Sequence, residues 1–319
     1  MYYDYKGWWI SSAREYLSNF RNGAICVTWG RNDEDKMYNE LPKLITSNDL
    51  DQYAYANFLM QCHRNDINDL YKALDIAKNL MHKGNGLGNY LYAFLIYGGK
   101  VLKKVDDIAY AHLVKANELI PDFAPGLFNV GICLVKGEGC TKNLDLGLQY
   151  IQRAKELGFN RAINYIGLLY YNGYRNYPLD YAKAFECFRE SAFRGDENGY
   201  FYQALMYRKG EGVPQDHKRS LDCYSLAGTK GHVDAAYYAG LVQITGENHP
   251  VNYEAAAYHL ENAAKWGHAK AMWMLGVLYL EKIYLFYGKQ EEGKQWIIKS
   301  CRLGCQEAID TAKKANIRY

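Results

Sequence analysis

A small residue recurs through this chain every 36 to 38 residues, and this period constrains the fold more than any other feature. The column reads Ala73, Ala109, Gly147, Ala184, Ser220, Ala256 and Gly293. A second small column precedes it by 16 or 17 residues and reads Ala56, Ala93, Gly131, Gly167, Ala204, Gly240 and Gly276. Periods of this length are typical of repeat proteins, in which each unit contacts its neighbours along the chain. The sequence therefore predicts seven repeated units.

Glycine and short polar residues indicate where the helices of each unit begin and end. Eleven residues after the first column stand Gly84, Ile120, Gly158, Gly195, Gly231, Gly267 and Gly304. Glycine there can adopt the left-handed conformation that ends a helix, and only Ile120 departs from the pattern. Preferred helix N-caps stand four residues before the column at Asp69, Asn143, Asp180, Asp216 and Asn252. Each unit is predicted to contain a helix A, a turn and a helix B.

The turns and helix ends also carry a family resemblance. The stretches LGVLY (275–279), IGLLYYNG (166–173), ALMYRKGEGVPQD (204–216) and AGTKGH (227–232) resemble Sel-one-like repeats, the longer-turn relatives of tetratricopeptide repeats. Residues 124–308 match that pattern over five repeats, whereas residues 50–122 keep the spacing but lack the GxGV turn. The resemblance implies an all-α, right-handed α/α solenoid of about seven repeats. Its helices A would line a concave groove that binds a protein or peptide.

Four positions on helix A, counted from its small residue, lie on the arc that would face that groove: minus three, plus one, plus four and plus five. The minus-three column is aromatic in six of seven repeats and reads Tyr53, Tyr90, Phe128, Asn164, Phe201, Tyr237 and Trp273. The plus-four and plus-five columns vary between repeats, which favours exposure to solvent or to a partner. The predicted partner-binding residues are Tyr90, Tyr97, Phe128, Asn164, Tyr171, Phe201, Arg208, Lys209, Tyr237, Ile244, Trp273 and Leu280. The alternative interpretation of the aromatic column is packing between helices.

The two ends of the chain do not follow the repeat. Residues 1–49 are rich in tyrosine and tryptophan, so we expect either a cap on the first repeat or an arm that crosses the groove. Residues 50–308 are assigned to the repeats. Residues 305–319 form a predicted capping helix whose end occupies 309–319, with basic residues where the helix dipole favours them.

Composition and motifs disfavour several classes of function. A formal charge of +3 over 319 residues argues against nucleic acid as the partner, and the absence of a long apolar run or an export signal predicts a cytoplasmic protein without a membrane span. No catalytic motif, cofactor motif or metal-ligand spacing stands out. His232 and His268 share one repeat position and are interpreted as residues of the joints between repeats. Cys187 and Cys223 share a packing column on helix B.

The leading hypothesis is a non-enzymatic interaction protein, either an adaptor or regulator or an immunity-type neutraliser of a toxin or effector. One alternative is a small-molecule-binding or hydrolytic protein. It follows from the secreted cysteine-rich members of the resembled family, which carry disulfides within each repeat and have been linked to penicillin binding. This chain departs from them, because only the third repeat has such a pair, Cys133 with Cys140. Cys301 and Cys305 lie near the last helix end. The other alternative is a structural protein that associates with itself.

Overall fold

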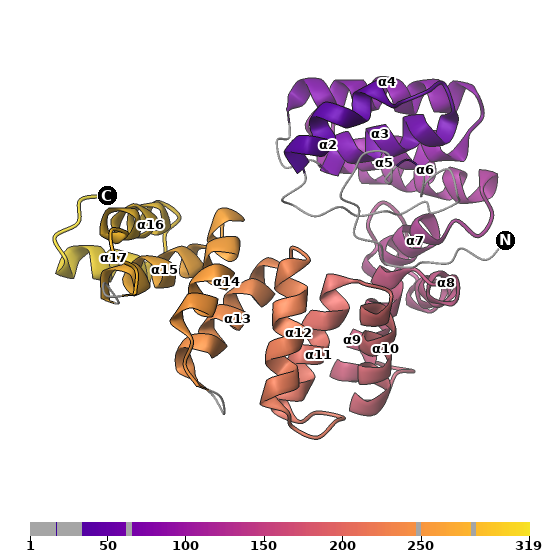
Figure 1. Ribbon diagram of the computed structural model, residues 1–319. Coiled ribbons are helices and arrows are strands. Elements are labelled where there is room, and N and C mark those ends of the chain that lie inside the picture. The colour runs from indigo at the N-terminus through magenta and orange to yellow at the C-terminus, as the bar shows by residue number, and fades with distance from the viewer. Residues whose placement is uncertain (1–16, 18–33, 62–65, 247–249, 282–284) are drawn as a thin grey trace. The chain divides into compact units, whose positions relative to one another are not determined.

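The computed structural model describes residue 17 and residues 34–61, 66–246, 250–281 and 285–319 (Figure 1). The regular elements of these residues are helices, with a single isolated β-bridge between Tyr174 and Tyr177. The chain divides into two compact units, residues 1–168 (unit 1) and residues 169–319 (unit 2). Along the described part of the chain, no helix is long and apolar enough to cross a membrane.

Among the described residues, seven helices A alternate with seven helices B, as the period predicts. The helices A have 13 residues each and are α3 (Asp49–Gln61), α5 (Gly86–Gly98), α7 (Ala124–Lys136), α9 (Asn160–Asn172), α11 (Glu197–Lys209), α13 (Val233–Thr245) and α15 (Ala269–Glu281). The helices B are α4 (Ile67–His82), α6 (Asp106–Leu119), α8 (Leu144–Glu156), α10 (Tyr181–Phe193), α12 (His217–Thr229), α14 (Tyr253–Lys265) and α16 (Gln290–Arg302). The predicted all-α solenoid fold is confirmed.

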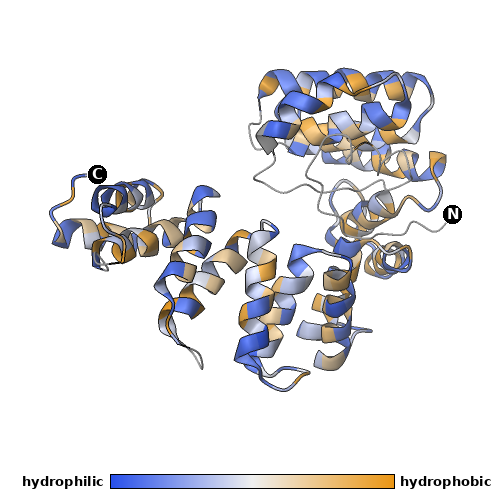
Figure 2. Ribbon diagram, in the orientation of Figure 1, coloured by the Kyte–Doolittle hydropathy of each residue, from blue (hydrophilic) through white to orange (hydrophobic). Residues whose placement is uncertain are grey.

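The two small columns let helix A and helix B of one repeat approach closely. In unit 1, a Cβ atom added to Gly147 would lie 2.7 Å from the carbonyl oxygen of Gly131. In unit 2, a Cβ atom added to Gly276 would lie 2.7 Å from the carbonyl oxygen of Gly293. Most helices carry both polar and apolar residues, as Figure 2 shows. Close contact between their apolar faces buries the core within each unit.

The predicted helix ends are confirmed at the glycines. Gly158 has a φ of 80° and Gly231 has a φ of 98°, both in the left-handed region. The exception at Ile120 is also real, because its φ is −127° and the left-handed residue is instead Asp122, with a φ of 62°. A side chain at the glycine positions would cost about 1–2 kcal/mol of backbone strain.

Four of the five predicted helix N-caps are confirmed, and the fifth is wrong. The caps that accept a hydrogen bond from a backbone amide of the first turn are Asn143, Asp180, Asp216 and Asn252. Asp69 is not a cap, because α4 begins a turn earlier and Asp66 accepts from the amide of Asn68. The buried carboxylate of Asp69 instead accepts from the hydroxyl of Tyr38 at 2.7 Å and from Lys72 at 2.9 Å.

The described part of residues 1–49 packs against the first repeat. Helix α2 (Glu34–Glu40) and the short helix η2 (Leu41–Lys43) bury Met37 and Leu41 completely, and the ring of Tyr38 lies 6.5 Å from that of Phe58. Leu17 is buried in the same core. The other aromatic residues of the predicted cap or arm lie in 1–16 and 18–33, outside the described residues.

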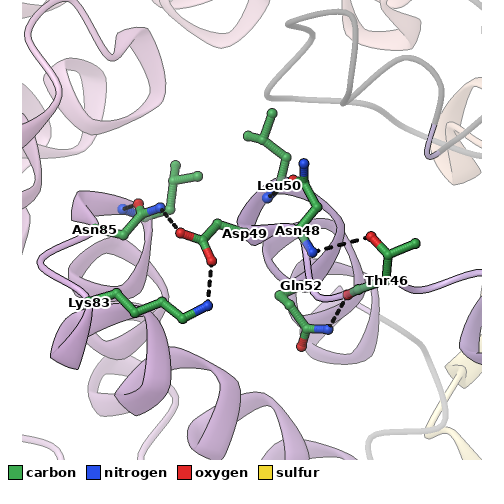
Figure 3. A network of polar contacts seen from close by, with 8 residues as sticks. Thr46, Asn48, Asp49, Leu50, Gln52, Lys83 and Asn85 are labelled. Carbon is green, nitrogen blue, oxygen red and sulfur yellow. Dashed lines mark hydrogen bonds and ion pairs between the residues drawn. The ribbon is translucent and has the colours of Figure 1, made fainter.

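Polar contacts fix the start of the first helix A, as Figure 3 shows. Asp49 accepts hydrogen bonds from Lys83 at 2.7 Å and from Asn85 at 3.1 Å, so the first turn of α3 is tied to the turn between α4 and α5. At the other end of the chain, α17 (Gln306–Lys314) packs on α15 and α16 with Ala308 and Ala312 fully buried. Lys313 and Lys314 occupy its last turn, as expected for a helix C-terminus.

Candidate partner-binding surface

The minus-three column lies where consecutive repeats meet. Its unit 1 members, Tyr53, Tyr90, Phe128 and Asn164, are all buried, and its unit 2 members, Phe201, Tyr237 and Trp273, are half-buried. The ring of Tyr90 meets that of Phe123 at 4.8 Å, and the ring of Phe128 meets that of Phe159 at 5.4 Å. Packing between repeats therefore accounts for the recurrence of aromatic residues in this column. Contact of its residues with a partner stays a prediction.

In unit 2 the same contact is made with histidine. The ring of Phe201 stacks on His232 at 4.2 Å, and the ring of Tyr237 stacks on His268 at 4.4 Å. Phe123, Phe159, His232 and His268 all stand eight residues before the next helix-A small residue. The histidines also cap helices, because Nδ1 of His232 accepts from the amide of Ala235 and Nδ1 of His268 accepts from the amide of Ala271. Their interpretation as joint residues is confirmed.

The other predicted columns differ in exposure. The plus-five column, which includes Lys136, Asn172, Lys209, Thr245 and Glu281, is exposed in every repeat. The plus-four column, which includes Tyr97, Tyr171, Arg208, Ile244 and Leu280, is half-buried throughout. The plus-five side chains are therefore available to solvent or to a partner, whereas the plus-four side chains are only partly accessible.

The plus-one column belongs to the predicted groove-facing arc, although the list of predicted site residues omits its members. Its members are Asn57, Phe94, Ile132, Leu168, Leu205, Leu241 and Val277, all half-buried and six of them apolar. They lie on the same face of each helix A as the minus-three and plus-four columns, because residues four and seven apart share a helix face. The sequence carried this signal in its helical periodicity, but residue type alone did not separate these positions from the core.

The three columns occupy equivalent positions on three helices of unit 2, and we call this set the unit 2 arc. It consists of Phe201, Leu205 and Arg208 on α11, Tyr237, Leu241 and Ile244 on α13, and Trp273, Val277 and Leu280 on α15. All nine side chains are half-buried, and eight of them are apolar or aromatic. Six of them also pack against the core of unit 2, so each of these offers only its uncovered part to another molecule.

The corresponding face of unit 1 is more closed. On α5 the ring of Phe94 contacts those of Tyr90 at 4.9 Å and Tyr97 at 6.5 Å. The hydroxyl of Tyr97 lies 3.1 Å from Sγ of Cys133, and burial raises the pKa of both groups. Asn129 donates a hydrogen bond to the hydroxyl of Tyr90 at 3.2 Å. These internal contacts leave fewer groups for a partner than the unit 2 arc does.

A polar cluster borders the unit 2 arc beside α11. The hydroxyl of Tyr171 donates to Oε2 of Glu211 at 2.6 Å and accepts from Nζ of Lys209 at 2.8 Å. The hydrogen bond to Tyr171 raises the pKa of Lys209, and burial, followed by the bond to Glu211, raises the pKa of Tyr171. Sequence reasoning missed Glu211. Because it lies 3.6 Å from the Lys209 ammonium, a carboxylate of a partner would compete with it.

Cysteine and metal chemistry have little support among the described residues. Cys133, Cys140, Cys301 and Cys305 are free thiols. Burial raises the pKa of Cys223 to about 11, so its thiol is protonated near neutral pH. Within the described ranges, no three His, Cys, Asp or Glu side chains converge as metal ligands.

Comparisons with known proteins agree with the repeat pattern. The Sel1 repeat model matches residues 124–159, 160–196, 199–232, 233–268 and 269–305. A Sel1 repeat protein from Oxalobacter formigenes is similar at 24% identity over 75% of this chain and 99% of its own, with a TM-score of 0.63. A protective antigen of uropathogenic Escherichia coli with an SLR fold is similar at 20% identity over 93% of this chain and 62% of its own, with a TM-score of 0.55. These two likenesses concern the fold. No curated protein matches the chain.

Proposed function

We propose that this chain, which belongs to the Sel1 repeat family, is a non-enzymatic interaction protein that binds a protein or peptide partner on its helices A. The observation that supports the proposal is the unit 2 arc, where three consecutive repeats present half-buried apolar side chains at the same positions. Solenoids of stacked helix pairs use such extended surfaces for binding. The arc would form one wall of the predicted concave groove.

The arc has the chemistry of an interface centre. Full burial of a leucine or valine side chain is worth about 1.5–3 kcal/mol, so completing the burial of Leu241 and Val277 would contribute about 1 kcal/mol each. Aromatic anchors such as Trp273 commonly carry a large share of binding energy. The exposed plus-five residues Lys209 and Glu281 would form a polar rim beside this centre.

Two roles fit an interaction protein of this kind. An adaptor or regulator would hold its partner for assembly, and a neutraliser would cover the active surface of a toxin or effector. Both would use the same arc, and identification of the partner separates them. A second copy of the chain is the alternative occupant of the arc. Light scattering of the purified chain at several concentrations tests this self-association directly.

The experiment compares two double variants of the full chain in partner capture from a lysate of the source organism. Leu241→Glu/Val277→Glu places two carboxylates on the arc. Leu226→Glu/Tyr258→Glu places two on exposed positions of helices B, where these side chains are 47% and 56% exposed. The proposal expects a protein retained by wild type and by the helix-B variant and lost by the arc variant.

Circular dichroism on the same samples separates binding from folding. All three proteins should keep the same helical signal and melt within a few degrees of each other. A partner lost only by the helix-B variant would contradict the proposal and place binding on the opposite helices. Collapse of the helical signal in the arc variant alone would instead mean that Leu241 and Val277 belong to the core.

A further inference from the structure

His268 makes three contacts at the joint between the sixth and seventh repeats. Its Nδ1 accepts a hydrogen bond from the amide of Ala271 at 3.0 Å and so caps α15. Its ring stacks on Tyr237 of α13 at 4.4 Å with only 20° between the planes. Its Nε2 lies 3.6 Å from Oδ1 of Asp234, also on α13. The cap and the stack depend on one ring orientation.

The cap requires a neutral imidazole. An amide N–H can donate to Nδ1 only while that nitrogen carries a lone pair, which places the ring hydrogen on Nε2, toward Asp234. In the imidazolium both nitrogens carry hydrogen, so no rotation of the ring restores an acceptor for Ala271. The positive charge would also lie at a helix N-terminus, where the dipole opposes it.

We propose that protonation of His268 breaks the cap of α15 and loosens its stack on Tyr237, so that this joint of unit 2 opens in mild acid. The switch is built from the geometry of the joint and needs no ligand. A similar arrangement recurs one repeat earlier, where His232 caps α13 at 3.1 Å and stacks on Phe201.

The charged groups around His268 oppose one another. Asp234 on α13 favours the imidazolium, whereas Lys270 on α15 disfavours it, and Tyr237 presents its ring face. Lys270 is held 2.9 Å from Glu307 of α17, whose pKa is lowered to about 2 chiefly by that hydrogen bond, so this pair stays charged in mild acid. Burial is the largest influence on His268, and its pKa is lowered overall.

A lowered pKa in the folded state fixes the direction of the effect. The opened state has the ordinary histidine pKa of about 6.5 and takes up the proton more readily than the folded joint. The contribution of the neutral cap is therefore complete above pH 6.5 and is lost as the pH falls below it. Because Tyr237 belongs to the unit 2 arc, release of a bound partner in acid would follow, a consequence that rests on the proposed function.

Hydrogen exchange measured by mass spectrometry tests the joint without any partner. The protection of a peptide within α15 is compared at pH 7.5 and pH 5.0 after correction for the intrinsic exchange rate. Wild type should lose up to about 30-fold, the limit given by the 1.5 pH units below the ordinary pKa. His268→Asn should lose far less, because Asn caps without titrating, as Asn252 caps α14 at 2.9 Å.

Two further variants complete the test. His82→Asn removes an exposed histidine of α4 and should behave as wild type. Asp234→Asn removes the charge that favours the imidazolium and should lower the histidine pKa, seen by NMR titration of the ring. Equal loss of protection in wild type and His268→Asn would overturn the proposal. So would a measured pKa of His268 at or above 6.5.

Discussion

At the scale of single residues, two half-buried positions on α13 have different roles despite similar exposure. Tyr237 stacks on His268 of the next repeat, whereas Leu241, one turn later, is a smaller, half-buried side chain of the unit 2 arc. Removal of a large side chain that holds two elements together leaves a cavity and lost contacts, whereas truncation of a smaller, half-buried side chain leaves less of both. The two positions therefore separate stability from binding.

We expect Tyr237→Ala to lower the free energy of unfolding by about 2–3 kcal/mol, somewhat below the values for fully buried aromatics. Leu241→Ala should lower it by less than about 1 kcal/mol. Urea denaturation of both variants, followed by circular dichroism, measures the difference. Equal losses would mean that Leu241 is also held in a core, and a negligible loss for Tyr237→Ala would mean that its stack carries no stability.

The thiol of Cys223 gives a second test at this scale. With a pKa of about 11, roughly 0.1% of it is thiolate at pH 8, against about a quarter of an ordinary cysteine with a pKa of 8.5. Iodoacetamide should therefore label Cys223 at least a hundredfold more slowly in the folded chain than in urea, with the rate rising tenfold per pH unit up to pH 10. Fast labelling in the folded state, read by peptide mass spectrometry, would show that the folded protein does not raise the pKa of this thiol.

The sequence located the residues of the joints but not their contacts. His232 and His268 share a repeat position, and the aromatic column has its own period, so both sets are visible in the sequence. Which face of one repeat meets the next depends on how the helix pairs stack, and side-chain periodicity within one helix does not determine that. The stack of Tyr237 on His268 could therefore be found only in the structure.

At the scale of elements, glycines of different turns share the same backbone conformation but differ in how closely other atoms surround them. Gly84 and Gly139 both lie in unit 1 and have φ values of 72° and 71°. A Cβ atom on Gly84 would meet nothing within 4 Å, whereas one on Gly139 would lie 2.0 Å from the carbonyl oxygen of Asp106. The turn between α7 and α8, which contains Gly139, is therefore packed against the start of α6. The turn after α4, which contains Gly84, has free space around that glycine.

We expect Gly84→Ala to cost about 1 kcal/mol of stability, the strain of a left-handed alanine. Gly139→Ala should cost about 2 kcal/mol more, because the backbone of the turn must also move away from Asp106. Thermal melts and urea denaturation of the two variants provide the comparison. Equal losses of stability in the two variants would show that the turn between α7 and α8 does not pack tightly against α6.

Helix boundaries were predictable where the side chain of the predicted cap bonds to the first turn of its own helix. Asn143 and Asp180 cap the helices that the sequence assigned to them. The prediction that Asp69 is a cap failed because Tyr38 and Lys72 bind its carboxylate, and Asp66 supplies the cap one turn earlier. Tyr38 is 31 residues away, so no local pattern announces that contact.

At the scale of the whole molecule, the repeat period passes through residue 168 without interruption, yet the chain divides there into two compact units. The period reports only local helix pairing, so it predicts the number of repeats and gives no information on this division. In a stack of repeats each unit contacts only its neighbours, and stability is approximately a sum of local terms. Damage at one end should therefore stay near that end.

Removal of α17 tests this locality. A chain that ends at Leu303 loses Ala308 and Ala312, which pack with the buried side chain of Ile297, and it loses the hydroxyl of Thr311 that accepts a hydrogen bond from the indole of Trp273. Hydrogen exchange should then rise by tenfold or more in α15 and α16 and stay within about twofold in α11, two repeats away. A chain that lacks only residues 318 and 319 serves as the control and should match the full chain. If stability is a sum of local terms, the effect stays in the last repeat. Loss of protection in α11 equal to that in α15 would instead mean that unit 2 unfolds as one cooperative body.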